Sequence, residues 1–372
     1  MTADTLSRLL SGILGLTPGH VLMLAVGGVL IYLAVVRGYE PMLLLPIGFG
    51  CILANIPLSG ITGEGGLLRL FYDTGIVTEI LPSLVFISVG AMTDFGPLFQ
   101  NPVLILLGAA AQFGIFGAML AAKAMGFSIN EAASIGMIGS ADGPTSIYVA
   151  SKLAPSLLGP IAVAAYSYMS LVPLIQPPIM RLLTTREERR IRMAYTGRPI
   201  SKVTRVLFPI VVTVVCGLLV PMATPLIGML MFGNLLRESG VVNRLAQAAQ
   251  NELANIVTII LGIAVGSSMM AASFLQWRTI LIVVMGLVAF ALDTAAGVVF
   301  GKIMCVLSGR RINPLVGASG ISAFPMSARV VHRLGLEEDM GNFLLMHAMA
   351  SNTAGQIASV MAGGVVLALL LH

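Results

Sequence analysis

Charged residues are scarce in this sequence of 372 residues, and their scarcity excludes an ordinary soluble domain. Asp, Glu, Lys and Arg make up 10% of the chain, whereas soluble domains carry about 25%. Apolar residues make up 57% of the chain, and the mean hydropathy is +0.96. Apolar runs near the ~20 residues that cross a bilayer core recur along most of the sequence. The sequence therefore predicts a polytopic membrane protein.

Several chemical classes are absent as well. The three cysteines, Cys51, Cys216 and Cys305, are isolated in apolar runs, so they predict neither a disulfide framework nor a metal cluster. The chain has no G-x-x-x-x-G-K-[ST] loop, H-E-x-x-H pair or G-x-S-x-G elbow, so ATP does not drive it through its own residues. None of its four lysines lies in a Met-Lys-Met turn, and we expect no covalent biotin. The net charge of +5 indicates no nucleic-acid partner, because the basic residues concentrate in one loop.

The apolar runs predict an all-α chain of about 10 to 12 membrane elements, some of them interrupted. The expected spans lie near 20–36, 41–57, 78–96, 102–124, 129–152, 158–180, 206–232, 253–275, 279–307 and 340–371. The last run is long enough for a broken helix or for two passes. Residues 1–19 are expected to form a short amphipathic helix at the membrane interface, with a disordered lead-in as the alternative.

One strongly polar connection, residues 181–205, separates two hydrophobic halves of similar length, 20–180 and 206–372. It holds eight of the 21 Lys and Arg residues against two glutamates. Because short loops rich in Lys and Arg stay on the cytoplasmic side, we expect this loop in the cytoplasm. It serves either as a linker alone or as a docking site for a cytoplasmic partner.

The two halves echo each other in sequence. The first contains "GSADGPTSIYVASKLAP" and the second contains "GASGISAFPMSARVVHRLG", each a Gly/Ser/Pro-rich break before a basic residue and a later apolar helix. Breaks are expected around 139–146, 313–329 and 350–356. Paired Gly/Pro interruptions at corresponding places point to a binding site at the midplane of a transporter-like fold. We therefore predict two halves of inverted topology whose interrupted helices meet near the midplane.

Asp142 lies in the first of these breaks, between Gly139 and Pro144, inside an otherwise apolar run. Pro and Gly open the backbone there, and open backbone inside a membrane survives only where it is buried in protein or lines a cavity. An ionised carboxylate at that depth is costly unless a charge balances it. A Na⁺ ion held by Asp142, the hydroxyls of Thr145 and Ser146 and freed carbonyls meets both needs. The alternative is an Asp that only caps the next half-helix, and both roles can coexist.

Other polar residues within apolar runs are candidates on the same grounds. Asp94 and Asp293 are ionisable groups that either serve function or are merely solvated or paired. The tyrosine pair Tyr166 and Tyr168 offers a proton donor, or simply a hydrogen-bonded phenol. His347 is expected to be structural. In the second half, the residues whose uncharged oxygens could complete a Na⁺ shell, or else support close helix packing, are Asn313, Ser319, Ser322, Asn352, Thr353 and Gln356. Arg329 lies beside the same Gly-rich break.

Five long motifs together carry a family resemblance. They read "IGSADGPTSIYVASKLAP", "AAYSYMSLVPLIQPPIMRLLTT", "GNLLRESGVVNRLA", "INPLVGASGISAFPMSARVV" and "FLLMHAMASNTAGQIAS". In this order they resemble the β subunit of the sodium-pumping, biotin-dependent decarboxylases, which act on oxaloacetate, methylmalonyl-CoA or glutaconyl-CoA. The resemblance covers the chain from about residue 40 onward.

The resemblance implies a multi-pass subunit of a bacterial or archaeal cytoplasmic membrane. Such a subunit takes carboxybiotin from a partner, releases CO₂ and free biotin, moves Na⁺ outward and takes up a proton. It also implies a carboxytransferase subunit, a biotin carrier and a small single-span subunit as partners, in an assembly that can be of higher order.

Residue by residue, the family's aspartate falls on Asp142, a Na⁺ and proton site, and its relay tyrosine falls on Tyr168. Its polar residues after the loop fall on Asn313, Gly317 and Ser322, and its asparagine in the last span falls on Asn352, an ion ligand. Its arginine falls on Arg329, which we expect to meet the anionic carboxyl group together with Ser322. The ion ligands expected in all are Asp142, Thr145, Asn313, Ser322 and Asn352.

A second class of function fits the break pattern too. A free-standing Na⁺-coupled secondary transporter for a carboxylate or for protons also needs interrupted helices and a buried aspartate. A purely structural scaffold is the third possibility. The long motif matches favour the decarboxylase subunit over both.

Overall fold

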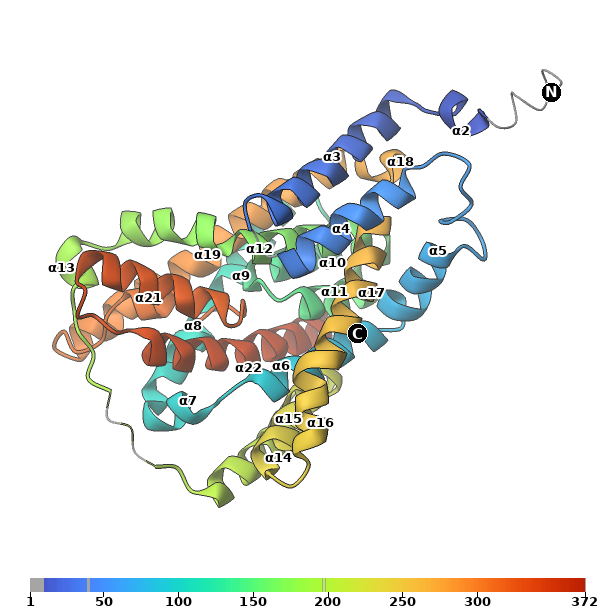
Figure 1. Cartoon of the computed structure of the whole chain (residues 1–372). Coiled ribbons are helices and arrows are strands. Elements are labelled where there is room, and N and C mark those ends of the chain that lie inside the picture. Colours follow the sequence, from blue (N-terminus) through green and yellow to red (C-terminus); the bar gives the residue numbers. More distant parts are fainter. Residues whose placement is uncertain (1–9, 39–40, 196, 198, 372) are drawn as a thin grey trace.

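The computed structural model describes residues 10–38, 41–195, 197 and 199–371, and no strand occurs among them. The helices lie in one bundle (Figure 1). Its α-helices in chain order are α2 (Ser11–Leu14), α3 (Pro18–Val35), α4 (Pro41–Ala54), α5 (Leu67–Phe71), α6 (Ile80–Met92), α7 (Gly96–Gln100), α8 (Ile105–Ala111), α9 (Phe113–Ala124), α10 (Ile129–Gly136), α11 (Gly143–Leu153), α12 (Leu158–Leu183), α13 (Arg186–Arg189), α14 (Lys202–Leu219), α15 (Thr224–Ser239), α16 (Asn243–Ala248), α17 (Ala254–Ser267), α18 (Ala271–Phe274), α19 (Trp277–Leu307), α20 (Leu315–Ala318), α21 (Met326–Glu338) and α22 (Leu345–Leu370).

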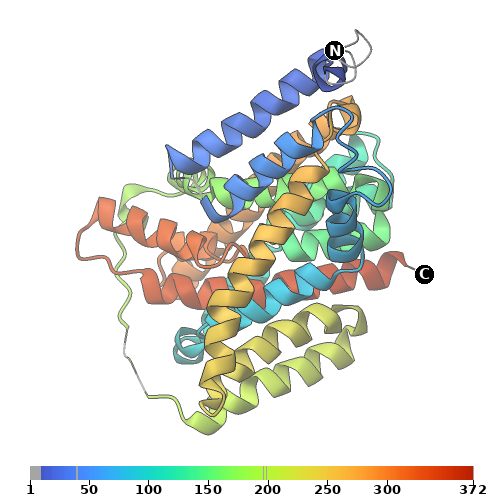
Figure 2. The same ribbon diagram turned by 45° about the vertical axis from the view of Figure 1, so that its right-hand side comes forward.

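The helices confirm the prediction of an all-α, polytopic membrane protein. Within the described residues, seven helices are long and apolar enough to cross a membrane, and the bent pair Leu67–Val77 and Ile80–Met92 can make an eighth span. The predicted 10 to 12 elements also count the shorter helix α4 and the interrupted elements. Only 17% of the spanning window of α3 and 6% of that of α14 is buried. These two helices lie at opposite margins of the bundle (Figure 2), where a lipid-facing surface is expected.

The last span and the span after the basic loop differ from the prediction. α22 is one unbroken helix of 26 residues, so the break expected around 350–356 is wrong. The amides of Asn352 and Gln356 donate to carbonyls of residues 319–322, and Thr353 Oγ1 donates to Ala350 O within the helix, so none of the three interrupts the helix's own backbone bonds. The run 206–232, expected as one span, is divided between α14 and α15. Pro221 lacks the N–H that a continuous helix needs there, and a 3₁₀ turn, Pro221–Ala223, joins the two.

Polar contacts gather several chain segments at one end of the bundle, here called the basic-loop end. Lys302 Nζ, near the end of α19, donates to Leu183 O at the end of α12 (3.1 Å). The last residues of α21 and the first residues of α22 contact the same segment. At the other end Arg278, at the start of α19, pairs with Glu131 of α10 (3.0 Å). α19 has 31 residues, which is about 46 Å of helix and enough to reach from one end to the other.

The two interrupted elements enter the bundle from different ends. α10 and α11 form the first hairpin: α10 starts beside Arg278, and α11 leads back to the start of α12, both at the far end. A 3₁₀ turn, Met137–Ser140, and Ala141 with φ of 52° make its tip. α20 and α21 form the second hairpin, which follows the end of α19 and returns to the basic-loop end, with residues 319–325 as its tip.

The two halves pack against each other reciprocally through glycines. A Cβ on Gly50 of α4 would lie 2.4 Å from Ile263 O of α17, and one on Gly266 would lie 2.1 Å from Ile47 O. α6 and α15 repeat the arrangement, with Gly90 against Leu230 O and Gly233 against Ile87 O. Only glycine permits such close approach of two helix backbones. This is the packing that two inverted halves would produce; their opposite orientation in a membrane stays a prediction.

Candidate functional site

Asp142 caps the second arm of the first hairpin. Its Oδ1 accepts from Thr145 N (3.2 Å), which satisfies an amide at the start of α11. Pro144 stands in the first turn of α11, where its missing N–H costs nothing. The capping role expected as the alternative is therefore present. It uses only one carboxylate oxygen and leaves the other for further contacts.

Three hydroxyls from three chain segments converge on the second oxygen, Asp142 Oδ2. Thr145 Oγ1 donates at 2.6 Å, Ser359 Oγ at 2.9 Å and Ser322 Oγ at 3.3 Å. All four residues are buried, with Asp142 5% exposed. Among the described residues no Lys, Arg or His forms an ion pair with Asp142. The cluster is thus a buried anionic site with hydroxyl oxygens around it and no cation of its own.

The tips of the two hairpins touch at this site. Ser322 N, in the second tip, donates to Ser140 O in the first (2.8 Å). α22 holds the second tip in place, because Asn352 Nδ2 donates to Ser319 O (3.1 Å) and Ile321 O (2.7 Å), and Gln356 Nε2 donates to Ser322 O. The Oδ1 atom of Asn352 is buried and has no hydrogen-bond partner among the described residues. It is therefore an oxygen without a partner on the face of α22 that holds the second tip.

The structure brings together Asp142, Thr145 and Ser322 from the predicted set, and Asn352 holds the tip that carries Ser322. Ser359 was not among the predicted residues. It lies seven residues after Asn352 and three after Gln356, so all three share one face of α22. Extending the polar pattern by one further helical turn would have found it.

The tyrosine nearest to Asp142 is Tyr166. Its ring packs on Gly143, where an added Cβ would lie 2.4 Å from Cζ, and its buried hydroxyl has no partner among the described residues. Tyr168 lies two residues on, which turns its side chain to the opposite face of α12. There its hydroxyl donates to Val283 O of α19. The proton relay assigned to Tyr168 stays a prediction, and the structure does not place Tyr168 at Asp142.

Asn313 and Arg329 lie away from the carboxylate. The amide of Asn313 donates to Arg189 O (3.0 Å) and Ile191 O (2.8 Å), so it is used at the basic-loop end. Arg329 is exposed on α21, one turn beyond the second tip, and it takes part in no ion pair within the described part of the chain. Arg333, one turn further, pairs weakly with Glu337 (3.8 Å).

The other acidic and histidine candidates have structural partners or none. Asp94 accepts from Gly96 N (2.8 Å) and approaches Arg237 (3.5 Å), so it caps a turn at the end of α6. His347 contacts Asn101 Nδ2 (3.2 Å) and Met193 O (3.3 Å), in line with the structural role expected for it. Asp293 is fully buried in α19. Its surroundings differ from those of Asp142, because no described side chain donates a hydrogen bond to its carboxyl oxygens.

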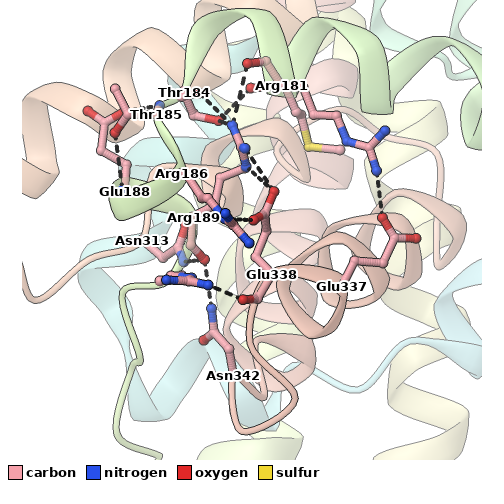
Figure 3. A network of polar contacts seen from close by, with 12 residues as sticks. Arg181, Thr184, Thr185, Arg186, Glu188, Arg189, Asn313, Glu337, Glu338 and Asn342 are labelled. Atoms are coloured by element: carbon pink, nitrogen blue, oxygen red, sulfur yellow. Dashed lines mark hydrogen bonds and ion pairs between the residues drawn. The ribbon is translucent and has the colours of Figure 1, made fainter.

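A charged network fastens the first part of the basic loop to the second hairpin (Figure 3). Arg189, which is 12% exposed, pairs with Glu338 (2.8 Å) and donates to Thr184 O (2.6 Å). Arg192 binds Asp339 through two nitrogens (2.7 and 2.8 Å). Asn342 Nδ2 donates to Arg189 O (2.8 Å). We call these contacts the loop clamp. They hold residues 184–193 against the end of α21, which is the second arm of the hairpin whose tip contains Ser322.

Opposite charge lowers the pKa of both acids of the loop clamp. The hydrogen bond from Arg192 lowers the pKa of Asp339 to about 2. Burial opposes the shift at Glu338, but hydrogen bonds from Arg189 outweigh it and lower that pKa as well. A carboxylate whose pKa is lowered on folding contributes stability above its unfolded pKa of about 4 and loses it as the pH falls toward the folded value. The loop clamp should therefore be intact at every physiological pH.

Replacing Arg189 by Ala should release the loop clamp, because it leaves Glu338 and the carbonyl of Thr184 without their main partner. A spin label on Ala194→Cys reports this as increased mobility. In the unsubstituted loop the same label should stay immobile from pH 8 to 5 and loosen only below about pH 4. A label that loosens near pH 6, or that ignores Arg189→Ala, would contradict the network.

Comparisons with known proteins identify the family of this chain. Residues 19–370 match the family described as the Na⁺-transporting oxaloacetate decarboxylase beta subunit. The chain is 56% identical to the glutaconyl-CoA decarboxylase subunit beta of Acidaminococcus fermentans, over 97% of this chain and 96% of that protein. It is 54% identical to the methylmalonyl-CoA decarboxylase subunit beta of Veillonella parvula, over 97% and 95%. It is 48% identical to the oxaloacetate decarboxylase beta chain of Haemophilus ducreyi, over 96% of each. With matches that span nearly its whole length, the chain belongs to the family of beta subunits of Na⁺-transporting decarboxylases.

Proposed function

We propose that this chain is the membrane subunit that couples the decarboxylation of carboxybiotin to outward Na⁺ transport. A biotin carrier and a carboxytransferase subunit deliver the carboxyl group from the cytoplasm, and a small single-span subunit completes the complex. Breaking the C–N bond of carboxybiotin releases CO₂ and leaves the electron pair on nitrogen, which takes up one proton. Family membership supports this function over a free-standing secondary transporter.

The observation that carries the proposal is the position of Asp142 between two hairpin tips. One hairpin opens toward the basic-loop end and the other toward the far end, so the carboxylate lies where two half-channels would meet. A hydroxyl can donate to the carboxylate and still offer a lone pair to a cation. Asp142, Thr145, Ser322 and Ser359 thus supply the oxygens and the charge that a buried Na⁺ needs, and Asn352 Oδ1 is a further candidate ligand.

Transport then requires the contact between the tips to change. The tips are joined by a backbone hydrogen bond between Ser322 and Ser140 and by hydroxyl bonds to a single carboxylate oxygen. When Na⁺ binds here, oxygens from both hairpins replace the water molecules that the ion has lost. A shift of one hairpin relative to the other exposes the ion to one end of the bundle, which is alternating access around a fixed site.

Arg329 is the residue we propose for the carboxyl group of carboxybiotin. It is an exposed guanidinium on the second hairpin, at the helix that leads from the tip to the cytoplasmic end. A guanidinium binds a carboxylate through two parallel hydrogen bonds. Release of CO₂ removes the carboxylate that pairs with Arg329. Arg329 and Ser322 belong to the same hairpin, so the loss of this ion pair can act on the ion site. This links the chemical step to the ion site without a covalent bond to the chain.

Na⁺-dependent release of CO₂ by the purified complex tests the proposed function. The complex is supplied with carboxylated free biotin in detergent, and CO₂ is measured while Na⁺ is varied against K⁺. Stimulation by Na⁺ supports a decarboxylase subunit with a Na⁺ site. Absence of CO₂ release, with Na⁺ flux driven by a proton or carboxylate gradient in vesicles, would establish the secondary transporter instead.

Replacing Ser359 by Ala should raise the Na⁺ concentration for half-maximal CO₂ release by about tenfold. The change removes the one hydroxyl that contacts both Asp142 Oδ2 and Ser322 Oγ, and hydrogen bonds to a charged group are worth about 1.5–3 kcal/mol. Ser351→Ala is the matched control on the same helix, because the Ser351 hydroxyl is buried and has no partner among the described residues. Equal effects of the two substitutions would remove Ser359 from the proposed site.

A further inference from the structure

Asp293 is a second buried carboxyl group that the Na⁺ site does not use. It lies in the middle of α19 and is fully buried. Neither of its carboxyl oxygens has a hydrogen-bond partner within bonding geometry among the described residues, although the backbone N–H of Ile115 faces it. The adjacent Thr294 hydroxyl is buried and also lacks a partner. An ionised carboxylate left in this state inside a membrane would be very costly.

The pocket of Asp293 is shaped by two glycines from two other helices. An added Cβ on Gly114 of α9 would lie 2.0 Å from Oδ1, and one on Gly139, at the first hairpin tip, would lie 2.6 Å from Oδ2. The same Cβ of Gly139 would lie 2.7 Å from Ala289 O, one turn earlier in α19. A side chain at either glycine would displace the carboxyl group. The acid is therefore seated in a close-fitting cleft between α9 and the tip that carries Asp142.

The surroundings of this carboxyl group fit a proton better than a metal ion. A Na⁺ ion needs several oxygen ligands, whereas Asp293 faces the α-carbons of two glycines and an N–H group. No Lys, Arg or His of the described residues pairs with Asp293. A bound proton makes the group neutral without any of these partners.

We propose that Asp293 is the intramembrane carrier of the proton that decarboxylation consumes, separate from the Na⁺ site at Asp142. This inference rests on the proposed function, since the proton is needed on the biotin nitrogen once the C–N bond has broken. Gly139 covers Oδ2 and is part of the tip that must shift for Na⁺ to pass. Movement of that tip would move Gly139 away and expose the carboxyl group. Proton exchange at Asp293 is thereby coupled to the movement that opens the ion site.

No charged side chain of the described residues forms an ion pair with Asp293. α19 packs against α8, α9, α10, α12 and α20, and against the 3₁₀ turn Met137–Ser140 that leads to Asp142. The ionisable residues on those helices that form described ion pairs, Glu131 and Arg181, lie at the bundle ends and pair there with Arg278 and Glu337. Lys302 of α19 itself binds Leu183 O and Glu188 at the basic-loop end. Proton exchange at Asp293 is thus governed by access rather than by a fixed neighbouring charge.

Infrared spectroscopy of the whole purified complex tests the proposal without any turnover. A protonated carboxyl group in a dry site gives a C=O stretching band that shifts in D₂O. We expect such a band in the wild type, displaced by ¹³C-labelling of the aspartate carboxyls. It should disappear in Asp293→Asn and remain in Asp142→Asn and in the neighbouring control Thr294→Val.

Transport assays give the functional arm. Asp293→Asn should slow proton uptake during decarboxylation by at least about 100-fold, the scale of a lost proton-transfer group. The Na⁺ concentration for half-maximal effect should stay within about twofold, and Thr294→Val should match the wild type in both. A wild-type complex without a label-sensitive band, or Asp293→Asn with wild-type proton uptake, overturns the proposal. Decarboxylation without Na⁺ transport by the wild-type complex would instead refute the proposed function. The infrared band would still show whether Asp293 carries a proton.

Discussion

Replacing Asp142 by Asn is expected to abolish Na⁺ transport and Na⁺-stimulated decarboxylation, with a loss of at least about 100-fold. The amide keeps the size of the side chain but removes the one negative charge of the cluster. It also presents an NH₂ group to Thr145, Ser322 and Ser359, whose hydroxyls all donate to Oδ2 in the native site. A loss of 100-fold in ion affinity corresponds to about 3 kcal/mol. ²²Na⁺ binding to the detergent-solubilised complex measures it directly.

Thr145→Ser is the matched control for this result. It keeps the hydroxyl that donates to Asp142 Oδ2 and the backbone N–H that donates to Oδ1. We expect its ²²Na⁺ affinity to remain within about threefold of the native value. If Asp142→Asn binds ²²Na⁺ as the native complex does, the hairpin tips do not form the ion site and Asp142 is a helix cap alone.

The second large effect is expected for Gly317→Ala. A Cβ at this position would lie 1.9 Å from Gly297 O, where α20 crosses α19. The contact is between backbones, so no rotamer change can relieve it, and overpacking in a tightly packed core costs about 1–3 kcal/mol. The second hairpin would be pushed away from α19, and Ser322 with it. We expect the unfolding temperature of the complex to fall by several degrees and CO₂ release to fall at least about tenfold.

Gly228→Ala serves as the control for a glycine inside a helix. It lies in α15, and an added Cβ there would meet no atom within 4 Å. Alanine has the higher helix propensity, so this substitution should be neutral or slightly stabilising. Equal losses from the two substitutions would indicate a general intolerance of glycine replacement rather than the close crossing of α19 and α20.

The sequence pattern predicted most of the fold because its signals are local. The length of each apolar run set the position of the spans: α19 was expected at 279–307 and lies at Trp277–Leu307. The break at Asp142 followed from Gly and Pro, whose backbone limits do not depend on context. The division of 206–232 was missed, since Pro221 lies within a run that stays apolar on both sides.

The candidate site was predicted in part for the same reason. Asp142, Thr145 and Ser322 lie in the two Gly/Pro-rich breaks, where polar atoms stand out against an apolar background. The meeting of the two tips, by contrast, is a tertiary contact between residues 180 positions apart. Nothing local distinguishes Tyr166 from Tyr168 or reveals that Asn313 binds the carbonyls of the basic loop. Those assignments depend on which face of a helix its neighbours cover.

The most direct test of the central claim is the simultaneous measurement of ²²Na⁺ uptake and CO₂ release by one preparation of vesicles that contain the whole complex. We predict that carboxylated biotin added outside drives ²²Na⁺ inward in the vesicles whose biotin-binding face points out. Uptake should stop when the carboxyl group is exhausted and should be absent with Asp142→Asn. CO₂ release at the native rate with no ²²Na⁺ accumulation, in vesicles shown to be tight, would contradict the coupling proposed for this chain.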